Sequence, residues 1–321
     1  MSLLYISQQS YNYITYFLVP TGIIGNGINI FIFIGDPTYR RTPCTFYFLV
    51  ASVSNIIFIV LNSINRILNI IHDGDFISIS NIWCKTRLFT SNYFIIISLT
   101  CSCLSSLDQF LVASRNVSVR RLSQIKRAHQ LVAITIIISF LYGIPVFLFY
   151  NISPMEQNCI ITNPHYAVYA AIHIIFFLCL IPITTMIVLD YLTYRNIRRT
   201  IALAKQHIDR QLVRMTFVQV ILVIISFLPF GINATYTLIT ANIIKDDNQK
   251  MIETSILVIV TLTGTLFNTV CFLFKNKMIE TSILVIVTLT GTLFNTVCFL
   301  FKNKMMTRIL LNVSRLAVMR S

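Results

Sequence analysis

Charged side chains are scarce in this sequence. Asp, Glu, Lys and Arg make up 11% of its 321 residues, whereas apolar residues make up 56%. A soluble domain carries about 25% charged residues, and the mean hydropathy of +0.77 is also well above the range of such domains. We therefore exclude a soluble globular protein and expect lipid to solvate most of the chain.

Several motifs are absent as well. The eight cysteines are too scattered for a disulfide scaffold, and none shows the Cys-x-x-Cys or Cys/His spacing of a metal site. The sequence has no Ser/His/Asp or Cys/His triad, carboxylate pair or phosphate-binding loop, and His173 stands alone in its apolar run. We therefore expect no enzyme activity, metal or cofactor. The first 13 residues hold no Lys or Arg, so we also expect no cleaved signal peptide.

Long apolar runs are abundant. Each reaches about 20 residues, the length that crosses ~30 Å of hydrocarbon. A backbone in lipid must satisfy its own hydrogen bonds, and runs without apolar and polar alternation do so as helices. The predicted fold is an all-α membrane protein, a seven-transmembrane helix bundle with spans at 14–34, 45–70, 84–112, 130–150, 166–192, 213–240 and 254–274.

The basic residues lie between these spans and alternate from loop to loop. The loops after the first, third and fifth spans hold thirteen Lys and Arg residues, and the opposite loops hold four. Lysine and arginine resist translocation, so the richer loops are predicted to be cytoplasmic. We expect a multi-pass plasma-membrane protein with its N-terminus outside. The net charge of +14 then reflects topology, and no nucleic acid partner is expected.

The C-terminal part contains an internal repeat. Residues 251–277 recur without one change as residues 278–304. Two copies of a single span do not make a solenoid, so we interpret the repeat as a duplicated seventh helix and a possible eighth span. The predicted organisation is a seven-transmembrane domain at 1–277, an extra apolar helix at 278–304 and a basic tail at 305–321. Either copy could complete the bundle; we expect the first.

Individual residues narrow the class. Cys84 opens the third span, and Asp108 follows 24 residues later in the triplet Asp108-Gln109-Phe110. Prolines interrupt the fourth, fifth and sixth spans, where they kink helices. Other matching positions are Gly25-Asn26, Tyr47 to Asn55, Pro145, Pro182, Ser226 to Pro229 and Asn268 to Phe272. Together these residues resemble the motifs of the rhodopsin-like (class A) G-protein-coupled receptor family across all seven spans.

The resemblance implies a receptor that passes an extracellular signal to heterotrimeric G proteins by helix rearrangement. It implies a disulfide between Cys84 and Cys159. The sequence departs from the family's motifs in two places: Asn55 replaces the Asp that holds sodium, and Gln109 replaces the Arg that reaches the G protein. We therefore expect no sodium-dependent brake and weakened coupling. The implied switch and G-protein face comprises Asn26, Asn55, Ser98, Asp108, Gln109, Phe110, Pro229, Asn268 and Phe272.

Polar residues of the second span suggest a ligand site. Several recur at helical spacing and so share a face that avoids lipid. Arg66 either snorkels to headgroups or pairs with an anionic group of a ligand. Ser91 stands where the amine receptors of the family carry Asp, which favours a peptide-like or other non-amine ligand. The expected pocket comprises Asn62, Asn65, Arg66, Asn69, Ser91, Asn92, Phe227 and Phe230.

Two other functions are considered. A small transporter would need ionisable residues deep in several helices, and the helix centres supply almost none. A receptor-derived membrane protein with lost or weakened signalling is compatible with Gln109, Thr269, Phe272 and the repeat.

Overall fold

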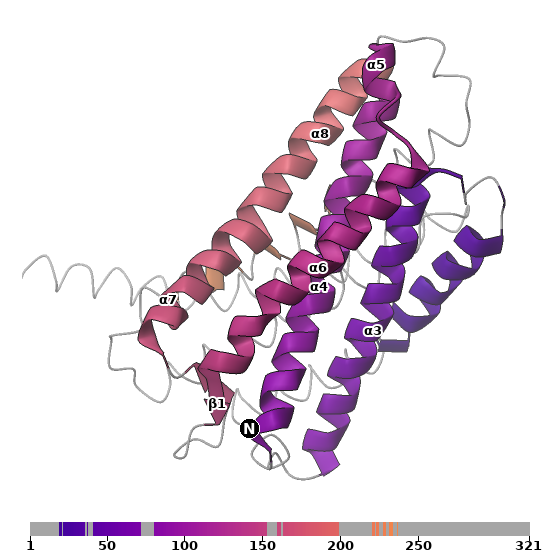
Figure 1. Cartoon of the computed structure of the whole chain (residues 1–321). Coiled ribbons are helices and arrows are strands. Elements are labelled where there is room, and N and C mark those ends of the chain that lie inside the picture. The colour runs from indigo at the N-terminus through magenta and orange to yellow at the C-terminus, as the bar shows by residue number, and fades with distance from the viewer. Residues whose placement is uncertain are drawn as a thin grey trace, which may run out of the picture.

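The described part of the chain is a bundle of helices (Figure 1). The computed structural model describes residues 19–20, 22–35, 37, 41–71, 80–152, 159–161, 163–198 and ten positions between 220 and 236. The described side chains of α3 end at Ile64. The elements are a helix at Gly22–Gly35, α3 (Pro43–Ile71), α4 (Asn81–Ala113), α5 (Val117–Arg120), α6 (Ile125–Phe149), β1 (Tyr150–Ile152), β2 (Cys159–Ile161), α7 (Pro164–His173), the π-helix η2 (Ile174–Leu180) and α8 (Ile181–Arg198).

Four helical segments in the described residues are long and apolar enough to cross a membrane. They are Pro43–Ile64, Asn81–Ala113, Ile125–Phe149 and His165–Ile197. They overlap the second to fifth predicted spans, and the shorter apolar helix Gly22–Gly35 overlaps the first and ends one residue beyond it. This confirms the helical membrane fold. The seventh span and both copies of the repeat lie outside the described residues.

Helix α4 occupies the centre of the described bundle, because α3, α6 and α8 all pack against it. Helix α6 shows how the sequence arranges this contact. Its buried residues recur every three or four positions and therefore line one face, while large apolar residues between them are exposed toward lipid. Small side chains on the buried face let the helices approach closely. That face comprises Ala128, Val132, Thr135, Ser139, Gly143 and Val146.

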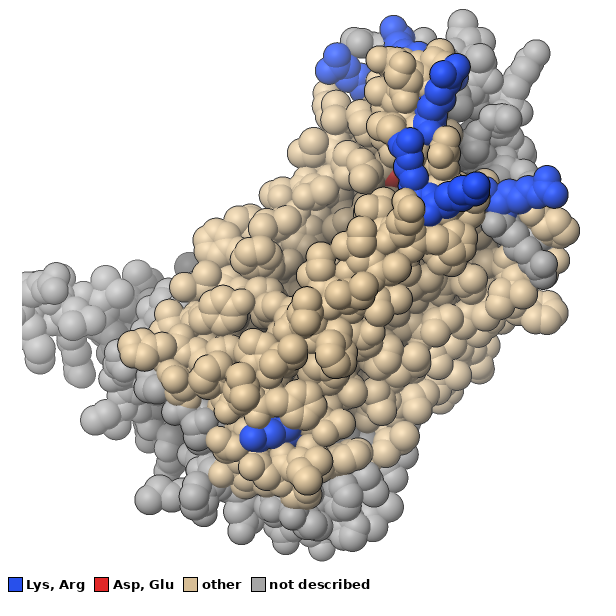
Figure 2. Space-filling model, in the orientation of Figure 1, with Lys and Arg blue, Asp and Glu red and all other residues tan. Residues whose placement is uncertain are grey.

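Basic side chains gather at one end of the bundle, where α5 lies (Figure 2). We call this the basic end. Its exposed residues come from the start of α3, the segment between α4 and α6, and the end of α8. The opposite end, called the disulfide end, holds the start of α4 and the β1–β2 hairpin. The exposed cations of the basic end are Arg41, Arg115, Arg120, Arg121, Lys126, Arg127 and Arg195.

The helices extend beyond their predicted spans at the basic end. Helix α6 begins at Ile125 instead of residue 130, and α8 continues to Arg198 instead of residue 192. The predicted bounds followed hydropathy alone. A helix continues past the hydrocarbon because its hydrogen bonds are internal and because Lys and Arg are good helix formers. Several basic residues assigned to loops therefore lie on helical ends.

Candidate functional site

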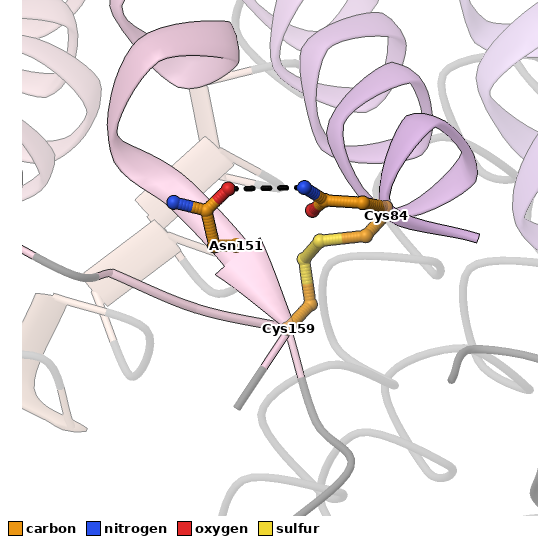
Figure 3. The surroundings of a disulfide bond; sticks show 4 residues. Cys84, Asn151 and Cys159 are labelled. Carbon is orange, nitrogen blue, oxygen red and sulfur yellow. Dashed lines mark hydrogen bonds between the residues drawn. A yellow bond between two sulfur atoms is a disulfide. The ribbon is translucent and has the colours of Figure 1, made fainter. Parts of the chain in front are cut away.

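The disulfide end is joined covalently. Cys84 in the first turn of α4 forms a disulfide with Cys159 in β2, with their Cα atoms 5.9 Å apart (Figure 3). β2 pairs antiparallel with β1, and Cys159 lies opposite Ile152. Asn81 Nδ2 donates a hydrogen bond of 3.1 Å to Asn151 Oδ1 and so ties β1 to the same helix end. The pairing agrees with the resemblance, whereas the hairpin had no counterpart in the predicted elements.

Three of the expected switch residues meet in the bundle interior. Ser98 Oγ donates a hydrogen bond of 2.6 Å to Asn55 Oδ1, and Asn55 Nδ2 lies 3.4 Å from Asn26 Oδ1. All three side chains are at most 2% exposed. A neighbouring contact of 3.4 Å between Asn29 and Ser52 joins the first helix to α3. Asn55 thus links three helices through neutral groups.

Asp108 fastens the basic end. One carboxylate oxygen accepts a hydrogen bond of 3.0 Å from the backbone N–H of Cys44 at the start of α3. The other accepts one of 2.6 Å from Ser123, which precedes α6. The following residue, Gln109, is 3% exposed, and Phe110 is partly buried. The carboxylate therefore holds α3, α4 and the α5–α6 segment together at the end that carries the cations.

The expected ligand pocket is described in part. Asn62 and Asn92 are partly buried, and each donates its side-chain N–H to the backbone oxygen four residues earlier, at 2.8 and 3.0 Å. Ser91 is also partly buried. These polar groups lie on α3 and α4, the helices that pack together at the bundle centre. The side chains of Asn65, Arg66 and Asn69, and the residues Pro229, Phe230, Asn268 and Phe272, lie outside the described residues.

Phe227 belongs to the apolar core between α4, α8 and the sixth span. It is 4% exposed and packs in one cluster with residues of those helices. Its backbone oxygen accepts a hydrogen bond of 3.3 Å from the Cys179 thiol in η2. A Cβ atom at Gly231 would lie 3.0 Å from the same sulfur. Phe227 is thus placed by close packing of η2 on the sixth span, and the cluster comprises Leu99, Leu178, Cys179, Met186, Val220, Val223 and Phe227.

His173 has aromatic neighbours and no catalytic partner among the described residues. Its ring stacks on Tyr142 with centroids 4.1 Å apart and on Phe177 at 5.1 Å. It is 8% exposed and is the last residue before the π-helix η2. The histidine therefore fills an aromatic contact between α6 and the fifth span. Outside the spans, burial raises the pKa of Tyr150, whose ring meets Tyr166 edge-on.

Two features escaped the sequence analysis. A Cβ atom at Gly143 would clash with Cε2 of Phe89, so α6 needs glycine where the Phe89 ring of α4 packs against it. Asp190 is a carboxylate buried within the fifth span, facing Ser106 of α4. A lone acid in an apolar run is a signal of function in membrane proteins, and that signal was available. The glycine contact depends on which faces meet and had no local signal.

The geometry is that of a helical membrane bundle with a disulfide at one end. At the opposite, basic end the Asp108 carboxylate holds neighbouring helices together. Residues 25–271, well over half of the chain, match the family model described as 7 transmembrane receptor (rhodopsin family). The chain belongs to this family. A search of curated proteins found no matching relative. As a rhodopsin-family receptor, it is a multi-pass plasma-membrane protein of the class that responds to extracellular ligands and signals to G proteins.

Proposed function

We propose that this receptor faces outward with its N-terminus, recognises a peptide-like or other non-amine ligand at the disulfide end, and couples to G proteins at the basic end with reduced efficiency. One observation supports the orientation: the disulfide and the cluster of cations lie at opposite ends of one bundle. Disulfides form on the oxidising side of a membrane, and basic residues stay on the cytoplasmic side. Two independent rules therefore give the same direction.

The ligand class follows from the chemistry of the described helices. Ser91 on α4 is neutral, so an amine ligand would find no counter-ion at that position. The asparagines of α3 and α4 offer uncharged donors and acceptors, as amide-rich ligands require. Arg66, in the last turns of α3, supplies the cation that a carboxylate of such a ligand would pair with.

The reduced coupling rests on Gln109. A glutamine amide offers neutral hydrogen bonds, whereas the family's arginine offers charge-assisted ones that are about twice as strong. Asp108 is retained and keeps the basic end closed through Cys44 and Ser123. The chain thus keeps the closing contact and lacks the cation that would stabilise the opened, G-protein-bound state.

The test is nucleotide exchange by a purified heterotrimer with the full chain in nanodiscs, at matched receptor density. Gln109→Arg is expected to raise exchange about ten-fold, because a charge-assisted hydrogen bond is stronger than a neutral one by on the order of 1.4 kcal/mol. Gln109→Ala serves as the size-reducing control. No gain from the arginine would make its loss irrelevant to output. No exchange by either protein would favour the second candidate, a receptor-derived protein without signalling, which Thr269, Phe272 and the repeat also suggest.

For the ligand, Arg66→Glu is expected to abolish the response to an identified agonist while surface expression remains.

A further inference from the structure

Asp190 is a buried acid without a hydrogen-bond partner among the described residues. It lies in α8, its side chain is 2% exposed, and neither carboxylate oxygen accepts a hydrogen bond in the described part of the chain. Ser106 of α4 is the polar side chain that faces it, yet the Ser106 hydroxyl is also fully buried and unpaired there. Two neighbouring polar groups on two packed helices are thus left unsatisfied.

Such an arrangement is costly. Buried polar groups are nearly always hydrogen-bonded, and a buried carboxylate is stable only with a counter-charge, a donor or a proton. The Thr193 hydroxyl, one turn after Asp190, donates its hydrogen bond to the backbone oxygen of Leu189. Gln109, one turn after Ser106 on the same face of α4, is a neutral residue. The described helices therefore supply no cation to this carboxyl.

The location points to where a cation would come from. Ser106 is seven residues before the end of α4 and Asp190 eight before the end of α8, or about 10–12 Å from those ends at ~1.5 Å per residue. Both ends lie at the basic end, where the exposed cations are concentrated (Figure 2). An acid thus lies about two helical turns beneath a basic rim, at a depth that a cationic group reaches only when it enters the bundle from that end.

We propose that Asp190 and Ser106 form a binding site for an ammonium or guanidinium group that enters the bundle from the basic end. The carboxylate would take two N–H donors in the bidentate geometry that guanidinium offers, and the Ser106 oxygen would accept a third. The group belongs to a cytosolic partner, because the basic end is the end that the proposed topology places in the cytosol.

The probe is methylguanidinium, tested on the full chain in nanodiscs against choline, which lacks N–H donors, at equal ionic strength. At ten times its Kd the probe is expected to raise the Tm by about 2–4 °C. Asp190→Asn should abolish this rise and Asp190→Glu should retain it. Ser106→Ala should raise the apparent Kd of the probe at least three-fold. Ser139→Ala is the control: it removes a hydroxyl of α6 that is also buried and unpaired among the described residues, and it should leave the Kd unchanged.

Two further arms identify the source of the cation. If the chain's own residues 199–214 supplied it instead, replacing Arg199, Lys205 and Arg210 by Gln would lower the probe's apparent Kd in the isolated protein. If a partner supplies it, that replacement should have no effect and added heterotrimer should compete with the probe. An equal Tm rise in wild type and Asp190→Asn would overturn the proposal. So would the absence of a Tm rise in wild type. These readouts do not require nucleotide exchange, so they stand apart from the test of coupling.

Discussion

The Asp108 carboxylate accepts the backbone N–H of Cys44 at 3.0 Å, which ties the end of α4 to the start of α3. The N–H belongs to the first turn of α3, where no earlier carbonyl of the helix is available to it. An anion at a helix N-terminus also interacts favourably with the helix dipole. One residue of the family triplet therefore acts as a cap for a neighbouring helix.

Breaking this contact should open the basic end. Asp108→Asn keeps the size of the side chain but leaves one acceptor oxygen for Cys44 and Ser123 together, so we expect a loss of about 1–3 kcal/mol of stability. Basal nucleotide exchange should rise as the closed state weakens. Ser123→Ala, which removes one of the two hydrogen bonds, should give a smaller effect in the same direction. Unchanged stability and exchange in Asp108→Asn would show that the contact does not hold the closed state.

The contact between Gly143 and Phe89 should limit what α6 tolerates. A Cβ atom at residue 143 would clash with the Phe89 ring, and that ring packs against Phe140 and Phe147. Gly143→Ala is expected to cost about 1–3 kcal/mol through overpacking, and Phe89→Leu should recover part of this loss. Gly27→Ala is the matched control, because a Cβ atom there would meet no described atom within 4 Å. Thermal melting in nanodiscs compares the wild type, Gly143→Ala, the double variant Gly143→Ala with Phe89→Leu, and Gly27→Ala.

The neutral contact of Asn55 with Ser98 and Asn26 should make the receptor insensitive to sodium. Sodium needs charged oxygen ligands, and none of these three side chains carries charge. We expect the wild-type Tm to be equal in NaCl and KCl at the same ionic strength. Asn55→Asp should create a sodium-dependent rise in Tm. Asn29→Asp, which changes another buried asparagine, this one on the first helix, should not. A sodium-specific rise in the wild type would contradict this prediction.

Removal of the disulfide should release the hairpin from α4. Cys84→Ser is expected to cost about 2–5 kcal/mol and to lower surface expression. Cys159→Ser should cost as much, and the double variant should cost no more than either alone, because both remove the same bond. Non-reducing peptide mapping should recover Cys84 and Cys159 as a cross-linked pair, with Cys44, Cys101, Cys103 and Cys179, the free cysteines of the described residues, outside it. An additive loss in the double variant would indicate that each cysteine acts separately.

Hydropathy predicted the fold because lipid leaves a backbone few alternatives to the helix. The resemblance implied the pairing of Cys84 with Cys159, and the structure has that disulfide. The contact of Asp108 with the Cys44 N–H was not predicted, because it depends on how the start of α3 lies against α4. Helix ends beyond the lipid and the β1–β2 hairpin leave no hydropathy signal. The Gly143 contact needs knowledge of which helix faces meet. Asp190 was overlooked although a lone acid in an apolar run is itself a signal of function.

The repeat at residues 251–304 lies outside the described residues. We propose that the first copy completes the bundle, and the family match supports this because it ends at residue 271, inside that copy. The second copy is equally apolar, so it must cross the bilayer or lie against it. Crossing would place the basic tail 305–321 outside, against the charge rule that the other loops follow. If the second copy completed the bundle instead, the tail would stay cytoplasmic.

An epitope tag after Ser321 distinguishes these arrangements on intact cells. With eight crossings and an outside N-terminus, antibody should bind the C-terminal tag without permeabilisation. With seven, it should bind only after permeabilisation. A tag before Met1, expected to be accessible in both cases, controls for surface expression. Deletion of residues 278–304 removes one copy in register, because the two copies are identical. If the deleted form keeps ligand response and its tag stays cytoplasmic, one copy suffices for the bundle; loss of surface expression in that form would mean that both copies are needed.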